Sequence, residues 1–486
     1  MKKFSMRVVL IISVLFIAFG SANVSIAQEM DTTNKLPEEE LGSLDTSNII
    51  AEEVAQDKPA EVENLEEIPT TDELMQNPDV REQSVADSDD PDLTVVSSGA
   101  YWTIYYNSAN GEYSLRMFGN VPSSKPSAWN SYLNSIKHIE IEEATLTGSF
   151  ASYFRNTGFP VLESVRIERS NLSGVTSFEM AFYSSGIEKV IIRDNYYPET
   201  PSLTNISRMF TQCFKLSEID VSGLNTSSVT DMGNVFNNAH SLKELDVSNW
   251  DTSSVTNMES MFLVCNSLEE LDVSNFDTSS VTNMESMFLV CNSLEELDVS
   301  NFDTSSVTNM KDMFTGLNFK KLDVSNFDTS SVTTMQAMFY NCYNLEELDL
   351  SNFDTSSVTT MYGMFLNCNS LEELDLSNFD TSSVTNMDRM FLNCNSLEEL
   401  DLSTFDTSSV TNMDRMFYGN EKLEKLDVSN WDTSSVTTMW AMFFECSSLE
   451  ELDLSHFDTS SVTNMDGMFQ DCTALKSLYL DNFTDA

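Results

Sequence analysis

Residues 271–296 read LDVSNFDTSSVTNMESMFLVCNSLEE, and this unit recurs with small changes over residues 219–478. The residue that opens each copy returns every 26 positions, except for one interval of 25 between Leu297 and Leu322. A fixed period of this size is typical of a solenoid, in which each coil buries its apolar face against its neighbours. Such a fold offers a long surface and seldom a catalytic pocket.

One unit predicts one coil. Residues 268–274 alternate apolar and polar side chains, as in a short strand with its apolar side inward. The DTSS segment at residues 277–280 favours a turn or helix start, since short side-chain oxygens accept bonds from nearby N–H groups. Val281, Met284 and Met287 then recur at helical spacing. We therefore expect each coil to consist of a strand, a turn and a short helix or 3-10 segment.

The same plan continues upstream in degraded form, with strand positions at Ile139, Val165 and Val190. The interval from Val190 to the next strand is 29 residues, which predicts a bulging loop at residues 196–201. Two aromatic runs within residues 102–117 predict a β-hairpin that caps the first coil. The expected organisation is a signal peptide (1–27), an acidic disordered stalk (28–98), a capping β-hairpin region (99–135), degenerate repeats (136–218) and regular repeats (219–486).

The N-terminus is typical of a secretory signal peptide. Lys2, Lys3 and Arg7 precede an apolar run over residues 8–19 that only Ser13 interrupts, and Ser25 and Ala27 offer small side chains for cleavage. This run is too short for a good membrane span. We therefore expect an exported protein, secreted or at the cell surface, with no membrane insertion after cleavage. Since neither an LPxTG motif nor a hydrophobic tail follows, we expect a shed protein or a shortened form of an anchored one.

The chain carries a formal net charge of −52. Residues 28–98 hold 21 acidic residues against three basic ones, and such a composition cannot offset the entropy of ordering. This segment is therefore expected to be a disordered, self-repelling stalk. The charge makes nucleic acid an unfavourable partner, whereas cationic proteins and weakly bound divalent cations are electrostatically allowed.

All eight cysteines share one position of the repeat, six residues before a strand leucine. Because Ala239 and Asn420 stand at that position in two other coils, no partner is required there. We interpret the column as small buried residues at a tight corner. Pairing of neighbours such as Cys265 and Cys291 under oxidation is the alternative, which the specific geometry of disulfides disfavours. The column comprises Cys213, Cys265, Cys291, Cys342, Cys368, Cys394, Cys446 and Cys472.

The pattern LxxLDLSNFDTSSVTNMxxMFxxCxSL, taken across the copies, resembles the BspA-type leucine-rich repeat of bacterial cell-surface proteins. The resemblance covers residues 219–486 closely and residues 136–218 loosely. It implies an α/β fold, a right-handed leucine-rich-repeat solenoid of about 14 coils. It also implies an exported adhesin or binding scaffold for host matrix proteins or other cells, and it carries over no catalytic residue and no single ligand.

Three columns are candidates for function. The aspartate after each strand leucine faces outward, either as a ligand- or cation-binding stripe or as a solvated face bonded to the adjacent serine column. The aspartate that opens each DTSS segment is explained by backbone capping. The column after each VTNM or VTTM varies, which predicts exposure and makes its aromatic members possible interface anchors or ordinary exposed residues. The candidate ligand-binding residues are Asp272, Asp298, Asp323, Asp349, Asp375, Asp401, Asp427, Tyr362 and Trp440.

Two classes of function remain. We favour a non-enzymatic binding protein whose outward sheet face holds a protein or glycan on host or bacterial surfaces. The alternative is a structural spacer or shield that projects a C-terminal module missing from this chain. His138, His240 and His456 are scattered in the sequence, and no catalytic fingerprint is present. We therefore expect no enzyme activity, no metal centre and no cofactor.

Overall fold

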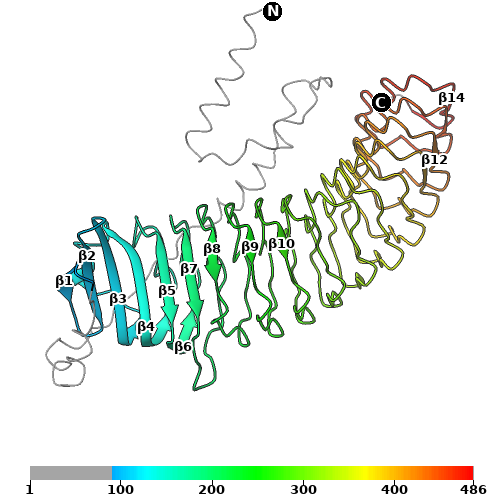
Figure 1. The fold of residues 1–486 in the computed structure, drawn as a ribbon. Coiled ribbons are helices and arrows are strands. Elements are labelled where there is room, and N and C mark those ends of the chain that lie inside the picture. Colours follow the sequence, from blue (N-terminus) through cyan, green and yellow to red (C-terminus); the bar gives the residue numbers. More distant parts are fainter. Residues whose placement is uncertain (1–89, 485–486) are drawn as a thin grey trace, which may run out of the picture. The chain divides into compact units, whose positions relative to one another are not determined.

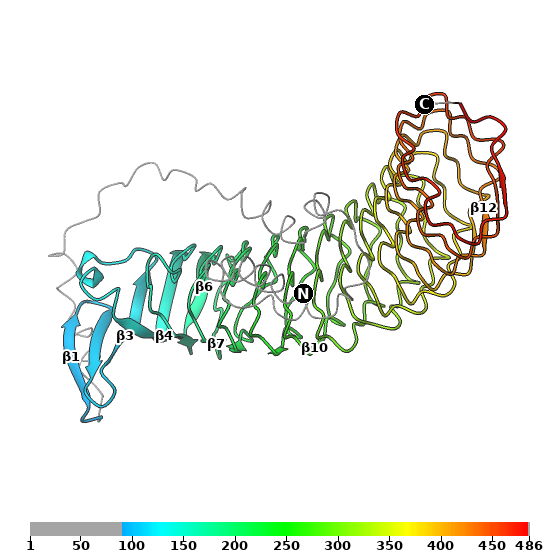
Figure 2. The same ribbon diagram turned by 90° about the horizontal axis from the view of Figure 1, so that it is seen from above.

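The computed structural model describes residues 90–484, which form a β-solenoid of about 14 coils with almost no helix. The coils follow one another in chain order in Figure 1, and Figure 2 shows the same row from above. The solenoid predicted from the 26-residue period is therefore confirmed. The predicted signal peptide and residues 28–89 of the predicted stalk lie outside the described residues.

An antiparallel hairpin precedes the coils, as the sequence predicts. β2 (Trp102–Asn107) pairs with β3 (Glu112–Pro122) across a turn in which Gly111 has a φ of 78°. β3 then pairs parallel with β4 (Ile136–Ser149), so the hairpin covers the first coil through backbone hydrogen bonds. A further strand, β1 (Leu93–Ser98), pairs with β2. The boundary predicted between stalk and cap therefore falls inside folded structure.

The strands shorten along the chain. β4 has 14 residues, whereas the strands of the regular repeats have only two or three. The first sheet runs β1-β2-β3-β4-β5-β7-β8 with β6 paired to β4, and three parallel pairs follow: β9 with β10, β11 with β12, and β13 with β14. The bounds are β5 Ser164–Glu168, β6 Asn171–Ser177, β7 Lys189–Arg193, β8 Glu218–Asp220, β9 Glu244–Leu245, β10 Glu270–Leu271, β11 Glu399–Asp401, β12 Lys425–Asp427, β13 Glu451–Asp453 and β14 Ser477–Tyr479.

The far side of each coil is not a helix, and this part of the prediction is wrong. Over residues 90–484 the only helix is a three-residue 3-10 segment, η3 (Ser127–Trp129). Residues 257–264 instead donate alternate backbone N–H groups to carbonyls of the next coil. We call this segment and its equivalents the far ladder. Its bonds in this coil run from Met258 to Asn283 (3.0 Å), Ser260 to Glu285 (2.8 Å), Phe262 to Met287 (3.0 Å) and Val264 to Leu289 (2.8 Å).

Residues with left-handed backbone explain why the apolar residues of the far ladder have helical spacing in the sequence. Ser260 and Val264 have φ values of 53° and 58°, and a turn between them is closed by the N–H of Leu263 and the carbonyl of Ser260 at 3.2 Å. Alternation of turns with left-handed residues directs every second amide to the next coil. As a result, every third or fourth side chain points into the core. The spacing of inward valines and methionines is therefore helical, while the hydrogen bonds run between coils.

Stacked columns of side chains fill the solenoid. Phe236, Phe262 and Phe288 occupy successive coils and are fully buried. Their ring centroids lie 5.9 and 5.7 Å apart, with planes tilted by only 7° and 8°. Burial of one phenylalanine side chain stabilises the fold by about 1.5–3 kcal/mol relative to exposure. Because each ring packs on its equivalents above and below, the core is continuous only in the stack.

The cysteine column belongs to this core, as the sequence predicts. Seven of the eight cysteines are buried, and none of the described cysteines forms a disulfide. Each Sγ donates to a phenylalanine carbonyl of the preceding coil, for example Cys265 to Phe236 at 3.2 Å and Cys291 to Phe262 at 3.0 Å. Burial raises the pKa of Cys291 to about 12. Equivalent thiols therefore lie in parallel, each directed at a carbonyl oxygen.

A buried threonine column joins the coils at the DTSS turn. The hydroxyl of Thr278 donates to the carbonyl of Asp303 in the next coil at 2.9 Å. The carboxylate of Asp277 accepts the N–H and the hydroxyl of Ser279 at 3.0 and 2.6 Å. The predicted capping role of the DTSS aspartates is therefore confirmed, although they close a turn and do not begin a helix.

One coil carries a buried carboxylate in the left-handed column of the far ladder. Asp312 has a φ of 55° and is 1% exposed, where the two preceding coils have Ser260 and Ser286. The amine of Lys311 lies 3.6 Å away and the hydroxyl of Thr315 donates at 3.3 Å. Burial nevertheless raises the pKa of Asp312 to about 6. Ionised Asp312 therefore destabilises the folded state, at a position where most other coils have a small residue.

The thiol arrangement predicts the redox state of the purified chain. Protein denatured without reductant should give eight reactive thiols per chain. Each cysteine is a free thiol that donates a hydrogen bond to a backbone carbonyl, and none forms a disulfide among the described residues. The native protein should react with close to none over minutes, since burial raises the thiol pKa values. A thiol titration measures both numbers. A denatured count well below eight would show that neighbouring cysteines pair.

Asp312 predicts a pH dependence of stability. Its folded-state pKa of about 6 lies above its ordinary value of 3.8, so the folded state takes up a proton between these pH values. Stability from this group is therefore present at low pH and is lost as the pH rises through about 6. Asp312→Ser should raise the free energy of unfolding at pH 7 by about 1–3 kcal/mol and flatten its pH dependence between pH 4 and 7.

Denaturant titrations at several pH values measure this effect. Asp466→Ser is the matched control, because Asp466 lies on the same ladder but is exposed. Equal pH profiles for Asp312→Ser and the unmodified chain would contradict the account.

Candidate ligand-binding surfaces

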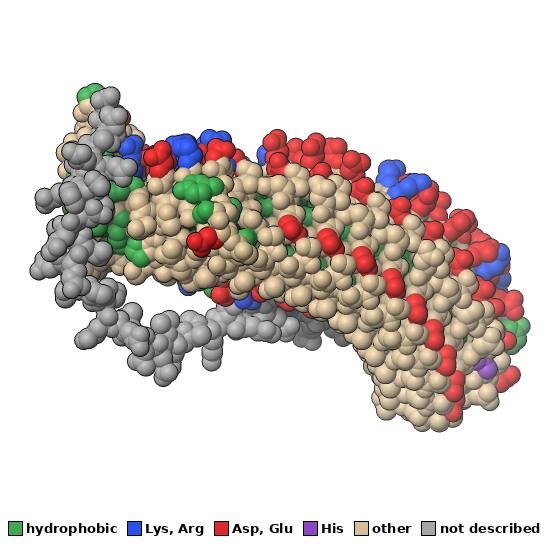
Figure 3. Space-filling model, turned by 90° about the horizontal axis from the view of Figure 1, so that it is seen from below, with side chains coloured by type: hydrophobic (Ala, Val, Ile, Leu, Met, Phe, Trp, Pro, Cys, Tyr) green, Lys and Arg blue, Asp and Glu red, His purple; other side chains and the backbone are tan. Residues whose placement is uncertain are grey.

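The structure places the predicted aspartates in one exposed line on the sheet face. Each follows a strand leucine that points into the core, and alternation turns the aspartate outward. Figure 3 shows acidic side chains along the solenoid as a row of separate carboxylates and as a denser band that includes basic side chains. We define the acidic stripe as Asp272, Asp298, Asp323, Asp349, Asp375, Asp401 and Asp427, all of which are exposed.

Each carboxylate of the acidic stripe is held by the serine two residues on. Asp272 accepts the N–H of Ser274 at 2.9 Å, and the same bond recurs through the stripe. Hydrogen bonds from Ser274 lower the pKa of Asp272, whereas the negative charge of Asp298 in the next coil acts in the opposite direction. The stripe is therefore a row of positioned negative charges. The bonded-serine interpretation is confirmed, and a ligand role for the stripe stays a prediction.

Glutamates and lysines flank the stripe, and sequence reasoning missed them. Two charged residues precede most strand leucines. Lys243 pairs with Glu269 of the next coil at 3.2 Å, and Lys320 pairs with Glu346 at 2.7 Å. Exposed pairs of this kind contribute little individually, about 0–1 kcal/mol. The signal for them is visible once the coils are aligned, as a Glu-Glu, Lys-Lys or Glu-Lys doublet in a fixed column.

Strand pairing follows these charges at only some steps, since no pair joins Glu296 to Lys321 among the described residues. At the steps β9–β10, β11–β12 and β13–β14, a lysine of one coil reaches a glutamate of the other. In the described chain no bridge joins Glu347 to Glu373, or Glu373 to Glu399, although these residues follow one another in the same column. Like charges directly opposite each other destabilise a strand pair. Strand pairs are therefore missing at these two steps between glutamates, although Glu244 and Glu270 do pair in β9–β10.

Tyr362 and Trp440 lie apart from the acidic stripe, on the far ladder. The expectation that they stand exposed is wrong, because both are half-buried. The hydroxyl of Tyr362 accepts a hydrogen bond from Arg389 at 3.0 Å. The guanidinium of Arg415 lies over the ring of Trp440, 3.7 Å from its centroid. The two aromatic side chains therefore cover arginines of neighbouring coils, a contact that depends on residues 25–27 positions apart.

Arg389 also meets an acid on the far ladder. Its guanidinium lies 2.6 Å from the carboxylate of Asp388, and both side chains are about nine-tenths buried. Burial raises the pKa of Asp388 to about 6, against the opposing charge of Arg389. A buried ion pair of this kind contributes little net stability. Arg389 stands in a column that holds serine, alanine or glycine in most other coils.

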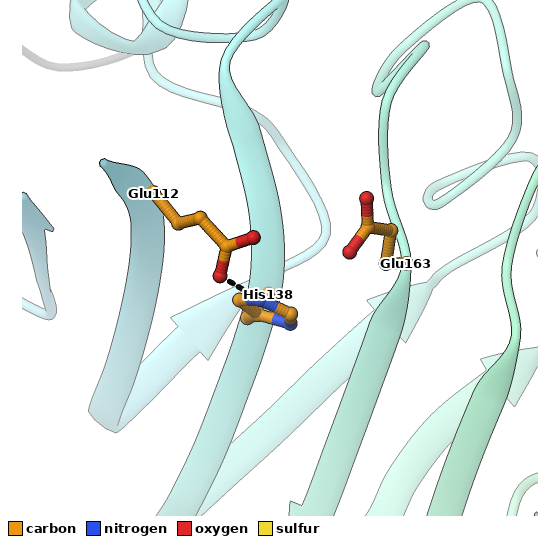
Figure 4. Close-up of side chains that lie close together, drawn as sticks. All are labelled: Glu112, His138 and Glu163. Atoms are coloured by element: carbon orange, nitrogen blue, oxygen red, sulfur yellow. Dashed lines mark hydrogen bonds and ion pairs between the residues drawn. The ribbon is translucent and has the colours of Figure 1, made fainter. Parts of the chain in front are cut away.

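A histidine and two glutamates meet on the first coils, which the scattered sequence positions did not suggest. Figure 4 shows Glu112 and His138 on neighbouring strands, with Glu163 directly before the next strand. The ring nitrogens of His138 contact Glu112 at 3.2 Å and the hydroxyl of Ser164 at 2.8 Å. The amine of Lys137 lies 3.1 and 2.7 Å from the two carboxylates. This donor set suits a divalent transition metal in kind, but the lysine already balances its charge.

Comparison with solved structures finds other solenoids at low identity. A leucine-rich cell surface protein from Faecalibacterium prausnitzii is 15% identical, with 80% of this chain and 94% of that chain covered and a TM-score of 0.30. A leucine-rich repeat protein from Eubacterium ventriosum is 14% identical, with 78% and 94% covered and a TM-score of 0.28. The functional domain of InlJ from Listeria monocytogenes, described as including a cysteine ladder, is 17% identical, with 67% and 59% covered and a TM-score of 0.18.

These TM-scores are too low to support an inference, so the fold assignment rests on the coils themselves. No curated protein matches the chain. A helix able to cross a membrane is absent from the part of the chain that the structure describes.

A family model matches the regular repeats. It aligns with residues 204–321, 317–400 and 393–484, which together span more than half of the 486 residues. The chain therefore belongs to the family described as Mycoplasma protein of unknown function, DUF285.

Proposed function

We propose that this chain is an exported bacterial surface protein of the BspA type, which binds a protein partner on host or bacterial surfaces through its sheet face. The proposed role is that of a non-enzymatic adhesin or scaffold. The repeat supports it, because a solenoid presents an extended surface suited to large partners. The apolar N-terminal run and the absence of a catalytic fingerprint in the sequence support export and a binding role.

The acidic stripe is the observation that carries the proposal. Its seven carboxylates stand in the same place on successive coils, and each is oriented by its own serine. A ligand therefore meets charges whose positions are already fixed, so little side-chain entropy is lost on binding. Between Glu347 and Glu399 the flanking charged residues of successive coils are all glutamates, which adds negative charge beside the stripe.

The chemistry of the stripe favours a basic partner. At a separation of 4 Å, one exposed pair of opposite charges gains only about 1 kcal/mol in water. A row of equivalent charges contacts several basic groups at once, and linked contacts raise the overall affinity without a unique pocket. Near-identical coils, such as residues 245–270 and 271–296, suit such repeated contact. The partner expected from these features is an extended or repetitive protein with a basic face.

A triple substitution in the stripe tests the proposal. The full chain should bind saturably to immobilised host matrix proteins or to bacterial cells, in a manner weakened by salt. Asp349→Asn, Asp375→Asn and Asp401→Asn together should reduce the affinity about tenfold or more. Asparagine keeps the oxygen that accepts the serine N–H, so the fold should be preserved, and thermal unfolding checks this.

The matched control removes the same charge from another face of the same coils. Asp354, Asp380 and Asp406 open the DTSS turns, are exposed and accept the same serine bond. Their triple replacement by asparagine should change the affinity less than about twofold. Equal losses in the two variants, or no saturable binding by the full chain, would contradict the proposal and favour the structural spacer.

A further inference from the structure

The interval of 29 residues between the strand positions Val190 and Ile219 creates a feature that the regular coils lack. After β7, Tyr196 still bridges Asn171 of the preceding coil, and the side chains on either side of it are hydrogen-bonded to the two neighbouring coils. Asn195 accepts the N–H of Ser170 at 3.0 Å and donates to the carbonyl of Ile167 at 3.1 Å. The second of these side chains, Tyr197, reaches the coil that follows.

Tyr197 is fixed by two hydrogen bonds through one atom. Its hydroxyl donates to the carbonyl of Gly223 at 2.8 Å and accepts the N–H of Asn225 at 2.9 Å. Burial raises the pKa of Tyr197 to about 12, so the hydroxyl keeps the proton that it donates. Tyr197 thereby joins this segment to the coil that follows.

A hollow of about 380 Å³ lies beside these anchors. Its lining comes from Asn195 and Tyr197, from residues 222–227, and from Asn249 and Asp251 of the next coil. This volume falls in the range of small-molecule sites, about 300–1,000 Å³. Because hydrogen bonds hold the inserted residues and the coil beside them, the hollow is formed before any ligand arrives.

Two residues that line this hollow differ from their equivalents in later coils. Gly223 stands where later coils have asparagine such as Asn249, and a Cβ atom at Gly223 would lie 2.6 Å from the Cα of Arg193. Only glycine permits so close an approach of the two coils. Asn225 stands where later coils have aspartate such as Asp251, which removes one negative charge from the wall. The hollow is therefore less acidic than the equivalent places farther along.

The lining selects the chemistry of a ligand. Among the described residues that line the hollow, none is basic, so an anionic ligand has no counter-charge there. Amides, hydroxyls, backbone groups and a single carboxylate offer hydrogen bonds at close spacing. The ring of Tyr197, which is half-buried, offers an aromatic surface in the lining. Several hydroxyl groups beside an apolar ring face are what a sugar presents.

We propose that this hollow is a binding site for a neutral sugar unit of a glycan. Hydroxyls of the sugar would bond to the carboxamides and serine oxygens of the walls, while its less polar face would lie against the ring of Tyr197. The site is separate from the acidic stripe, so it does not depend on the protein-binding role proposed above. It would give the solenoid one specific contact in addition to a repetitive one.

Filling the hollow tests the site. The full chain is applied to an array of immobilised oligosaccharides with neutral ends (glucose, galactose, mannose, N-acetylglucosamine and N-acetylgalactosamine) and to sialylated counterparts. At least one neutral oligosaccharide should bind saturably, and its sialylated form should bind at least about tenfold more weakly. Ser222→Arg should reduce the neutral binding about tenfold or more, because Ser222 is an exposed residue of the lining and arginine would occupy the space.

Ser248→Arg is the matched control. Ser248 is the equivalent exposed residue of the next coil, bonded in the same way to its own aspartate, and it does not line the hollow. This variant should bind the same oligosaccharide within about twofold of the unmodified chain. Both variants should unfold at the same temperature. No binding to any neutral oligosaccharide, equal losses in the two variants, or equal binding of sialylated forms would overturn the proposal.

Discussion

Backbone hydrogen bonds of the far ladder hold this solenoid in register. In most regular coils, four alternate N–H groups donate to the next coil, as from Ser260 to Glu285 and from Phe262 to Met287. This pattern requires left-handed residues at fixed places, which cost about 1–3 kcal/mol each unless the surroundings enforce them. The phenylalanine and cysteine columns beside the ladder provide that enforcement. The 26-residue period is therefore a backbone requirement as much as a matter of apolar packing.

Because the far ladder joins the coils, the sheet face on the opposite side does not have to hold them together. Strands on the sheet face of the regular repeats are two or three residues long, and pairing is absent between Glu347 and Glu399 within the described chain. Adjoining glutamates weaken a sheet that has to hold the coils together, because like charges oppose pairing. Here the coils are already joined on the far side and through the DTSS threonines. The sheet face is thus free to bear the charge density that the proposed binding role requires.

The sequence was sufficient for the number of coils, the hairpin and the buried columns, because these follow from period and alternation. It misled on the far side, where residues such as Met284 and Met287 have helical spacing without a helix. Left-handed backbone at serine or valine has no clear sequence signature, so the inter-coil ladder could not be inferred. For the candidate site, alternation correctly placed the acidic stripe outward. It could not show that Tyr362 and Trp440 cover arginines, since those contacts depend on neighbouring coils. The hollow beside Tyr197 was likewise visible only as a longer interval.

Amide hydrogen exchange, followed residue by residue, tests most directly whether the far ladder holds the coils together. The account predicts that amides of Met284, Ser286 and Phe288 exchange at least about tenfold more slowly than those of Glu373 and Leu374 on the sheet face. Exchange that is as slow or slower at Glu373 and Leu374 would contradict it, because the sheet and not the far ladder would then carry the stability of the stack.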